Sequence, residues 1–316
     1  MTSVLIYADI DFRGTSLAGV TTFHFVNPQQ SPSVTITFNS SQFGPGQASP
    51  FALFSHSTGV NGIVVYGNLI RADLWSMVNW GPEDSITLRA IGPGSAQIFG
   101  TDFADKIIGR SGNSEMLGRA GNDTFAGGGA DDMLYGGTGI DTLLCSGRSS
   151  VTVNLALGTV SNGDQVTSIE NVVGTIVGDL LIGDAAANLL QGAGGDDTLN
   201  GGAGFDTLAG GSGVDSFVYL ATSAAPVGRG VDTISDFSVR GGDVIDLSAI
   251  DANGSLAGDA FNFIGTAAFG RAAGQLRYSV GAGFVTVEAD VTGDGLADMV
   301  IRVLGVSTLS GTDFVF

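Results

Sequence analysis

The stretch GRAGNDTFAGGGADDMLYGGTGIDTLL, residues 118–144, repeats one pattern every nine residues. Each unit begins with glycine and carries an aspartate at its sixth position and an apolar residue at its eighth. Because glycine tolerates positive φ, the first six residues of a unit predict a tight turn. The last three predict a very short strand whose central apolar residue points to one side.

The nine-residue period covers two blocks of five units, 100–144 and 174–216. The sixth positions are Asp105, Ser114, Asp123, Asp132 and Asp141, then Asp179, Asn188, Asp197, Asp206 and Asp215. Every eighth position is apolar, from Ile107 to Phe217. One unit cannot bury its apolar residue alone, whereas stacked units can. We therefore predict an all-β fold with a parallel β-roll solenoid over 100–216.

The stacked turns also predict a cation site. Stacking brings aspartates of successive turns close together, which is unfavourable unless a cation lies between them. Carboxylates combined with backbone carbonyls favour Ca²⁺ over zinc. The predicted aspartate ligands are Asp105, Asp123, Asp132, Asp141, Asp179, Asp197, Asp206 and Asp215. The predicted loop glycines are Gly118, Gly121, Gly136, Gly137, Gly139, Gly192, Gly194, Gly201, Gly202, Gly204, Gly210, Gly211 and Gly213. The alternative is a glycine-rich solenoid without metal.

The unit GGxGxDxUx resembles the nonapeptide of the RTX (repeats-in-toxin) calcium-binding proteins. In that family two nonapeptides make one turn, and calcium lies between repeats n and n+2. The resemblance implies one edge with Asp105, Asp123 and Asp141 and another on which Asp132 faces Ser114. It implies the same for Asp179, Asp197 and Asp215, with Asp206 facing Asn188.

Some loops match the pattern better than others. The best sites are expected between loops 118–123 and 136–141, and between loops 192–197 and 210–215. Loops 100–105 and 174–179 lack the middle glycines, and loops 109–114 and 183–188 lack the acid. We expect these four loops to bind weakly or to cap the stack.

Composition limits the function classes. The 316 residues carry 12 Lys plus Arg against 31 Asp plus Glu, a net charge of −19, with glutamate at only four positions. This balance repels nucleic acid and anionic membrane, so neither is expected as a partner. The single cysteine, Cys145, allows no intramolecular disulfide, and no apolar run is long enough to span a membrane.

Between the blocks, residues 145–173 break the register. VTVNLALG alternates apolar and polar residues, which predicts a strand with Val151, Val153, Leu155 and Leu157 on one face. Spacers of this kind recur between nonapeptide blocks of RTX proteins. The predicted organisation is therefore three domains: 1–99, 100–216 with its spacer, and 217–316.

The last hundred residues, with DTISDFSVRGGDVIDLSAID (232–251) and the ending DFVF, resemble the C-terminal domain of serralysin-type proteases. In that family the C-terminus is an uncleaved signal for type I secretion, an acid followed by apolar residues. Asp313, Phe314, Val315 and Phe316 match this ending. The resemblance implies a bacterial, secreted protein whose partner is the type I machinery. The N-terminus does not match a cleaved signal peptide.

DVTGDGLAD (290–298) allows two interpretations. Asp290, Asp294 and Asp298 fit positions of an EF-hand loop, but Ile301 stands where the bidentate glutamate is needed. The flanking residues predict strands, so a β-hairpin turn is favoured over an additional calcium site.

Residues 1–99 predict strands, as a β-solenoid or small sandwich that leads into the roll. No catalytic or cofactor-binding residue is predicted. The serralysin HExxH motif is absent, as is GxSxG. His24 is expected in a strand, His56 in a loop, and Glu83 and Asp84 in a turn.

The sequence thus favours a secreted, non-catalytic RTX protein that folds on binding calcium. An adhesive, surface-layer or matrix role, with an extracellular polysaccharide or surface partner, is compatible with it. The alternatives are a hydrolase whose activity lies in 1–99 and a serralysin-like chain that lacks its protease domain.

Overall fold

The computed structural model describes residues 94–222, 225, 230–254 and 259–316. Before residue 94 it describes only 2–6, 10–11, 20–25, 33–39, 52–55, 60–66, 69–72, 76–78 and 85–90. The chain divides into two compact units, Met1–Leu144 with Asn162–Ile169, and Cys145–Ser161 with Glu170–Phe316. All regular structure in the described ranges is β, apart from single turns of 3₁₀ helix. No helix there is long and apolar enough to span a membrane.

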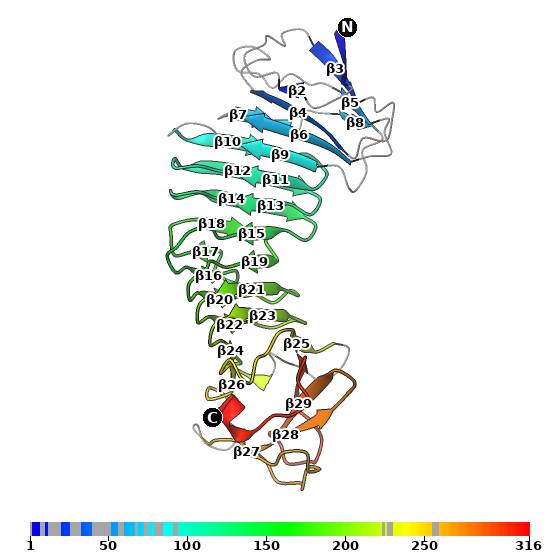
Figure 1. Cartoon of the computed structure of the whole chain (residues 1–316). Helices are drawn as coiled ribbons and strands as arrows, with labels where there is room; N and C mark the ends of the chain where they lie inside the picture. Colours follow the sequence, from blue (N-terminus) through cyan, green and yellow to red (C-terminus); the bar gives the residue numbers. More distant parts are fainter. Residues whose placement is uncertain are drawn as a thin grey trace. The chain divides into compact units, whose positions relative to one another are not determined.

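In the first unit the nonapeptide strands alternate between two parallel sheets (Figure 1). One sheet contains β9 (Ser85–Arg89), β11 (Asp105–Ile108), β13 (Thr124–Ala126) and β15 (Thr142–Leu144). The other contains β10 (Ala96–Phe99), β12 (Ser114–Ala120), β14 (Met133–Thr138) and β18 (Gln165–Thr167). Lys106 pairs with Thr124, eighteen residues on, so two nonapeptides make one turn. The predicted parallel β-roll is confirmed.

The strands before residue 85 are also parallel. A sheet of four contains β1 (Thr2–Ile6), β3 (Val20–Phe25), β5 (Ala52–Ser55) and β8 (Ser76–Val78). Strands β2 (Ile10–Asp11), β4 (Ser33–Asn39) and β6 (Val60–Tyr66) stack onto β9, while β7 (Leu69–Arg71) pairs with β10. The region is thus a solenoid rather than a sandwich. Its turns are longer than those of the roll, since Ile63 pairs with Ile86.

The second unit repeats the two-sheet arrangement. One sheet contains β16 (Thr152–Asn154), β20 (Leu180–Ile182), β22 (Thr198–Asn200), β24 (Ser216–Val218), β26 (Val244–Asp246) and β31 (Phe314–Val315). The other contains β19 (Asn171–Val173), β21 (Leu189–Gly194), β23 (Thr207–Ser212), β25 (Asp232–Ile234) and β30 (Met299–Leu304).

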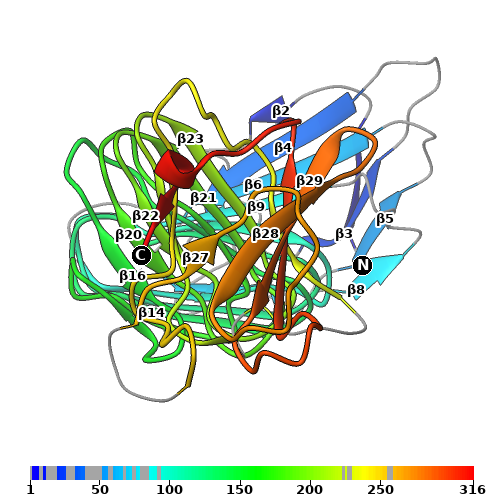
Figure 2. The same cartoon turned by 90° about the horizontal axis from the view of Figure 1, so that it is seen from below.

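The second unit ends in antiparallel structure. Strand β30 pairs with β29 (Phe284–Asp290), which pairs with β28 (Gln275–Val280), as Figure 2 shows. Strand β27 (Asn262–Phe263) pairs with β28, and β17 (Thr159–Val160) forms a hairpin with β16. Strands pair across residue 100 and across residue 217, the ends of the repeat region. The division into three domains stays a prediction.

Each nonapeptide strand contributes one residue to the core of the roll. The eighth-position residues are almost fully buried: Ile107, Met116, Phe125, Leu134, Leu143, Leu181, Leu190, Leu199, Leu208 and Phe217. Burial of one such side chain stabilises the fold by roughly 1.5–3 kcal/mol. Together these side chains hold the two sheets against each other.

The spacer differs from its prediction. The strand β16 covers only three residues, and a turn follows at residues 155–158. Val153 is buried, but Leu157 is 73% exposed, so the four predicted residues do not share one buried face. The alternation was misleading because the hairpin to β17 ends the strand early.

Candidate metal sites

The nonapeptide turns depend on left-handed backbone at their second and fourth positions. In loop 136–141, Gly137 has φ of 112° and Gly139 has φ of 141°; Gly211 and Gly213 repeat these values at 102° and 140°. A Cβ on Gly139 would also collide with the carbonyl oxygen of Gly121, one turn away. These turns therefore require glycine for both conformation and space.

Loop 192–197 departs from the predicted glycine set. Its left-handed residues are Ala193 (φ 76°) and Gly195 (φ 100°), so Gly195 occupies the fourth position. Gly194, which we included among the predicted loop glycines, lies in β21 and is not left-handed. The consecutive glycines of GAGGDD made the assignment ambiguous.

The sixth-position aspartates form rows along the roll. Except at Asp105 and Asp179, each uses Oδ1 to accept a hydrogen bond from the backbone N–H of the sixth residue one turn earlier. The first unit has Asp105 to Asp123 (2.8 Å), Asp123 to Asp141 (2.7 Å) and Ser114 to Asp132 (2.6 Å). The second has Asp179 to Asp197 (2.7 Å), Asp197 to Asp215 (3.0 Å) and Asn188 to Asp206 (2.8 Å). These pairs match the two-unit spacing that the resemblance implied.

Three further aspartates extend the rows beyond the repeats. Asp164 accepts from the N–H of Asp132 at 2.9 Å, Asp232 from that of Asp206 at 3.0 Å, and Asp243 from that of Asp215 at 3.0 Å. They were missed because they follow at irregular intervals. Each nevertheless stands two residues before a buried apolar residue, namely Val166, Ile234 and Ile245. This Asp-x-apolar signal is the one that could have found them.

The second carboxylate oxygen has no hydrogen-bond partner at most of these positions. It is buried at Asp123, Asp132, Asp197, Asp206, Asp215 and Asp232. A buried carboxylate oxygen without a partner is unfavourable, so an ion or a proton is needed to explain it.

The same oxygens surround the space beside the first glycine in different loops. A Cβ on Gly118 would overlap Oδ2 of Asp123 and lie 2.6 Å from the carbonyl oxygen of Gly136. A Cβ on Gly192 would likewise overlap Oδ2 of Asp197 and lie 2.6 Å from the carbonyl oxygen of Gly210. Carboxylate and carbonyl oxygens thus converge beside the first glycine of the loop. These residues fit a hard cation such as calcium.

Burial governs the electrostatics of the rows. It raises the pKa of Asp123 to about 8 and that of Asp197 to about 7, with neighbouring carboxylates adding to the shift. The pKa of Asp105 is raised to about 7, and those of Asp132 and Asp206 to about 6, also mainly by burial. Without a cation, these groups bind protons far more readily than an exposed aspartate does.

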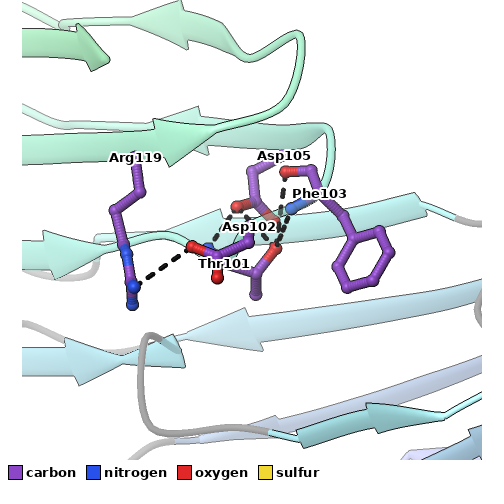
Figure 3. A network of polar contacts seen from close by, with 5 residues as sticks. All are labelled: Thr101, Asp102, Phe103, Asp105 and Arg119. Atoms are coloured by element: carbon purple, nitrogen blue, oxygen red, sulfur yellow. Dashed lines mark hydrogen bonds and ion pairs between the residues drawn. The ribbon is translucent and has the colours of Figure 1, made fainter. Parts of the chain in front are cut away.

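In the two opening loops a threonine donates hydrogen bonds to the aspartate. Thr101 donates its backbone N–H and its hydroxyl to Oδ2 of Asp105, at 2.6 and 3.0 Å (Figure 3). Thr175 repeats the arrangement with Asp179, at 2.5 Å from N–H to Oδ2 and 3.1 Å from hydroxyl to Oδ1. The hydroxyls also bind the loop backbone at Phe103 and Val177. Thr175 thus supplies donors to both oxygens of Asp179, whereas Oδ1 of Asp105 remains buried without a partner.

Two further contacts involve atypical loops. An ion pair between Arg119 and Asp102 (3.1 Å) spans the opening loop of the first block, as Figure 3 shows. The Nδ2 of Asn188 donates to the carbonyl oxygen of Glu170 at 2.9 Å. An amide here supplies a proton donor where an aspartate would need a cation. The expectation that the four atypical loops bind weakly or cap the stack stays a prediction.

The acidic loop 290–298 is the turn of the β29–β30 hairpin. The carboxylate of Asp290 accepts from the N–H groups of Gly293 (2.6 Å) and Gly295 (2.9 Å). Asp298 accepts from Val291 and Thr292, and Asp294 accepts from Leu296. Backbone donors therefore occupy the carboxylates, which favours the hairpin interpretation over an additional calcium site.

The C-terminal residues are part of the folded unit. Asp313 and Phe314 are 5% and 6% exposed, while Val315 and Phe316 are 39% and 38% exposed. Strand β31 pairs with β26, and the ring of Phe314 packs against that of Phe263 at 5.2 Å.

The remaining residues singled out in the sequence lie before residue 94, where the structure describes only part of the chain. His24 lies in β3, as expected, but its side chain is outside the described residues, as are His56, Glu83 and Asp84. Within the described parts of the chain, no three His, Cys, Asp or Glu side chains gather into a metal site. Any cation in the rows would therefore depend on backbone carbonyls as well as carboxylates.

Comparison with known proteins identifies a family. The family model of the peptidase M10 serralysin C-terminal domain matches residues 102–316, more than half of the chain. No curated protein matches. Among solved structures, the chain is similar to the extracellular lipase LipA from Serratia marcescens, with 13% identity and a TM-score of 0.26. That match covers 90% of this chain and 67% of the lipase.

Proposed function

Because the chain belongs to the peptidase M10 serralysin C-terminal family, we propose that it is a secreted RTX protein that folds on binding calcium after type I export. One observation supports this most strongly. Buried carboxylate oxygens without partners converge with carbonyl oxygens beside the first glycine of regular loops, as at Gly118 and Gly192.

Calcium would be held by the row aspartates of the regular loops, by Asp164 and Asp243, and by carbonyls of the glycine turns. The ion would supply positive charge where carboxylates are buried together. Metal binding would then provide folding free energy, because the unfolded chain has no such sites. Single sites of extracellular modules bind calcium at roughly 10⁻⁴ to 10⁻³ M, and stacking makes their binding cooperative.

Secretion follows from the same proposal. Where calcium is scarce, the acidic repeats repel each other and the chain stays loose, which suits export. At extracellular calcium concentrations the turns are neutralised and the roll forms. Residues Asp313, Phe314, Val315 and Phe316 would serve as the address for the type I machinery. The proposed role is non-catalytic, with an extracellular surface or polysaccharide as partner.

Far-UV circular dichroism tests this proposal. The chelated protein is titrated with CaCl₂, with MgCl₂ as the matched control. We expect a cooperative gain of β signal with calcium alone. A chain that is fully folded in chelator and indifferent to calcium would contradict the proposal.

A further inference from the structure

The outer face of one sheet in the first unit carries a regular set of side chains. Strands β10, β12, β14 and β18 follow one another in this sheet (Figure 1). Their central residues Ile98, Met116, Leu134 and Val166 are buried, so the neighbours on either side point outward. The outward residues are Gln97, Phe99, Glu115, Leu117, Met133, Tyr135, Gln165 and Thr167, all of them half-buried or exposed.

Three of these residues, Phe99, Leu117 and Tyr135, form an aromatic stripe across the strands. The register pairs Phe99 with Leu117, Leu117 with Tyr135, and Tyr135 with Thr167. Neighbouring strands lie about 4.8 Å apart, so the strands that carry the two rings are separated by roughly 9.6 Å. Leu117 fills the place between the rings, and Tyr135 is 38% exposed. The aromatic stripe is therefore one side chain wide and runs perpendicular to the strands.

Polar groups line one side of the aromatic stripe. The register places Gln97 beside Glu115, and Met133 beside Gln165. The Nε2 of Gln97 donates to Oε2 of Glu115 at 2.9 Å, which orients both side chains. The hydroxyl of Tyr135 donates to the Sδ of Met133 at 3.6 Å. Hydrogen-bonding amides and a carboxylate therefore lie next to the rings.

The opposite sheet of the same unit lacks this arrangement. The outward residues of β11, β13 and β15 are Lys106, Ile108, Thr124, Ala126, Thr142 and Leu144, which include no aromatic ring. The stacking of nonapeptides does not by itself produce an aromatic stripe. The stripe is therefore a property of one face of the roll.

The width and the charge of this face restrict its partner. A stable protein interface buries about 800 Å² on each partner, far more than a line of three side chains provides. The net charge of −19 repels polyanions, and Glu115 is the only charged side chain among the eight outward residues. A neutral sugar ring presents an apolar face that stacks on aromatic rings and hydroxyl groups that form hydrogen bonds at its edge. A linear chain of such rings matches a narrow stripe with polar groups beside it.

We propose that the aromatic stripe binds a linear, neutral polysaccharide. Sugar rings stack on Phe99 and Tyr135, while Gln97, Glu115 and Gln165 bind the hydroxyl groups. The inference rests on the proposed function, because the stripe forms only when the roll is folded. It adds the chemical class of the polysaccharide and the face that binds it.

Depletion from solution by insoluble polysaccharide tests the stripe in the full-length protein. The probes are microcrystalline cellulose and chitin, both neutral and β-linked, in excess calcium. Each variant is first checked for folding by circular dichroism. Tyr135→Ala removes one ring of the stripe, and Tyr135→Phe keeps the ring. Phe205→Ala is the matched control, because Phe205 is 47% exposed and lies in a loop of the second unit.

We expect the unmodified chain to bind at least one of the two polymers and Tyr135→Ala to bind it about tenfold more weakly. Tyr135→Phe and Phe205→Ala should bind like the unmodified chain. A folded chain that binds neither polymer, or equal binding by Tyr135→Ala, would overturn the inference and leave calcium-dependent folding intact. An equal loss in Phe205→Ala would show non-specific adsorption and would overturn it as well.

Analytical ultracentrifugation in calcium adds a second readout. Self-association that Tyr135→Ala abolishes, without binding to either polymer, would assign the stripe to a second copy of the chain and overturn the inference. If calcium produces no gain of β signal in the unmodified chain, the proposed function itself is wrong.

Discussion

Loops 174–179 and 192–197 are successive turns on one edge of the same roll, yet they treat their aspartates differently. In the first, Thr175 donates to both oxygens of Asp179. In the second, Oδ2 of Asp197 has no partner and faces the carbonyl oxygen of Gly210 across the space beside Gly192. The difference teaches that one backbone turn can be stabilised either by the protein alone or by an added ion. The choice depends on whether threonine stands at the second position of the loop.

The largest expected effect is that of pH on the calcium-free protein, because many regular loops contribute together. Burial raises the pKa values of Asp123 and Asp197 to about 8 and 7, above the ordinary 3.8. Between the ordinary pKa of 3.8 and these raised values, the folded state therefore holds more protons than the unfolded state. The free energy of unfolding falls as pH rises through this range. In chelator, far-UV circular dichroism should therefore show clearly more β signal at about pH 5 than at about pH 8.

Calcium is the control for this pH series. A bound ion keeps the carboxylates charged in the folded state, so the loss of β signal between acidic and mildly alkaline pH should disappear in excess calcium. A chelated protein whose β signal rises with pH over the same range would contradict the account of the buried carboxylates.

Filling one ion space should have the next largest effect. In Gly192→Ala, the new Cβ would overlap Oδ2 of Asp197 and approach the carbonyl oxygen of Gly210. We expect a loss of about 3 kcal/mol in the free energy of unfolding in calcium, typical of severe overpacking. Gly129→Ala is the matched control, since nothing lies within 4 Å of its added Cβ. Calcium-dependent denaturant unfolding of both variants measures the difference.

The two aspartates can be exchanged for asparagine to sharpen the contrast. Asp197→Asn should bind less calcium and lose about 1–3 kcal/mol of its calcium-dependent stability, because ligand binding stabilises only the native state. Asp179→Asn should keep the ion number of the unmodified chain. Calorimetric calcium titration gives both numbers, and equal losses in the two variants would show that the opening loop also needs an ion.

Removal of the threonine hydroxyl should have the smallest effect. Thr175→Val deletes the donor to Asp179 and should lower stability by about 1–2 kcal/mol, similarly with and without calcium. Thr198→Val, on the outer side of β22, is the control and should have little effect. A strongly calcium-dependent loss in Thr175→Val would mean that the hydroxyl supports an ion rather than replacing one.

The fold and the first members of each row could be predicted because they depend on a strict period. Nine-residue spacing determines which residues stack, so the partners of Asp105 and Asp179 follow from counting alone. Asp164, Asp232 and Asp243 could not be found in this way, because chain excursions of variable length separate them from their partners. The threonine caps were missed for a related reason. Their hydrogen bonds depend on side-chain geometry within one loop, which spacing does not report.

Strand β31 gives the C-terminus a structural role. Its residues Phe314 and Val315 complete the sheet beside β26, and Asp313 is held by the N–H and hydroxyl of Ser310. Under the secretion proposal, these residues are both the secretion signal and the last strand of the sheet. The transport machinery could therefore bind them only while the chain is unfolded. Folding would then hide the secretion signal, and the type I machinery could not recognise a molecule that has folded outside the cell. Under the secretion proposal, transport would be irreversible because folding hides the signal.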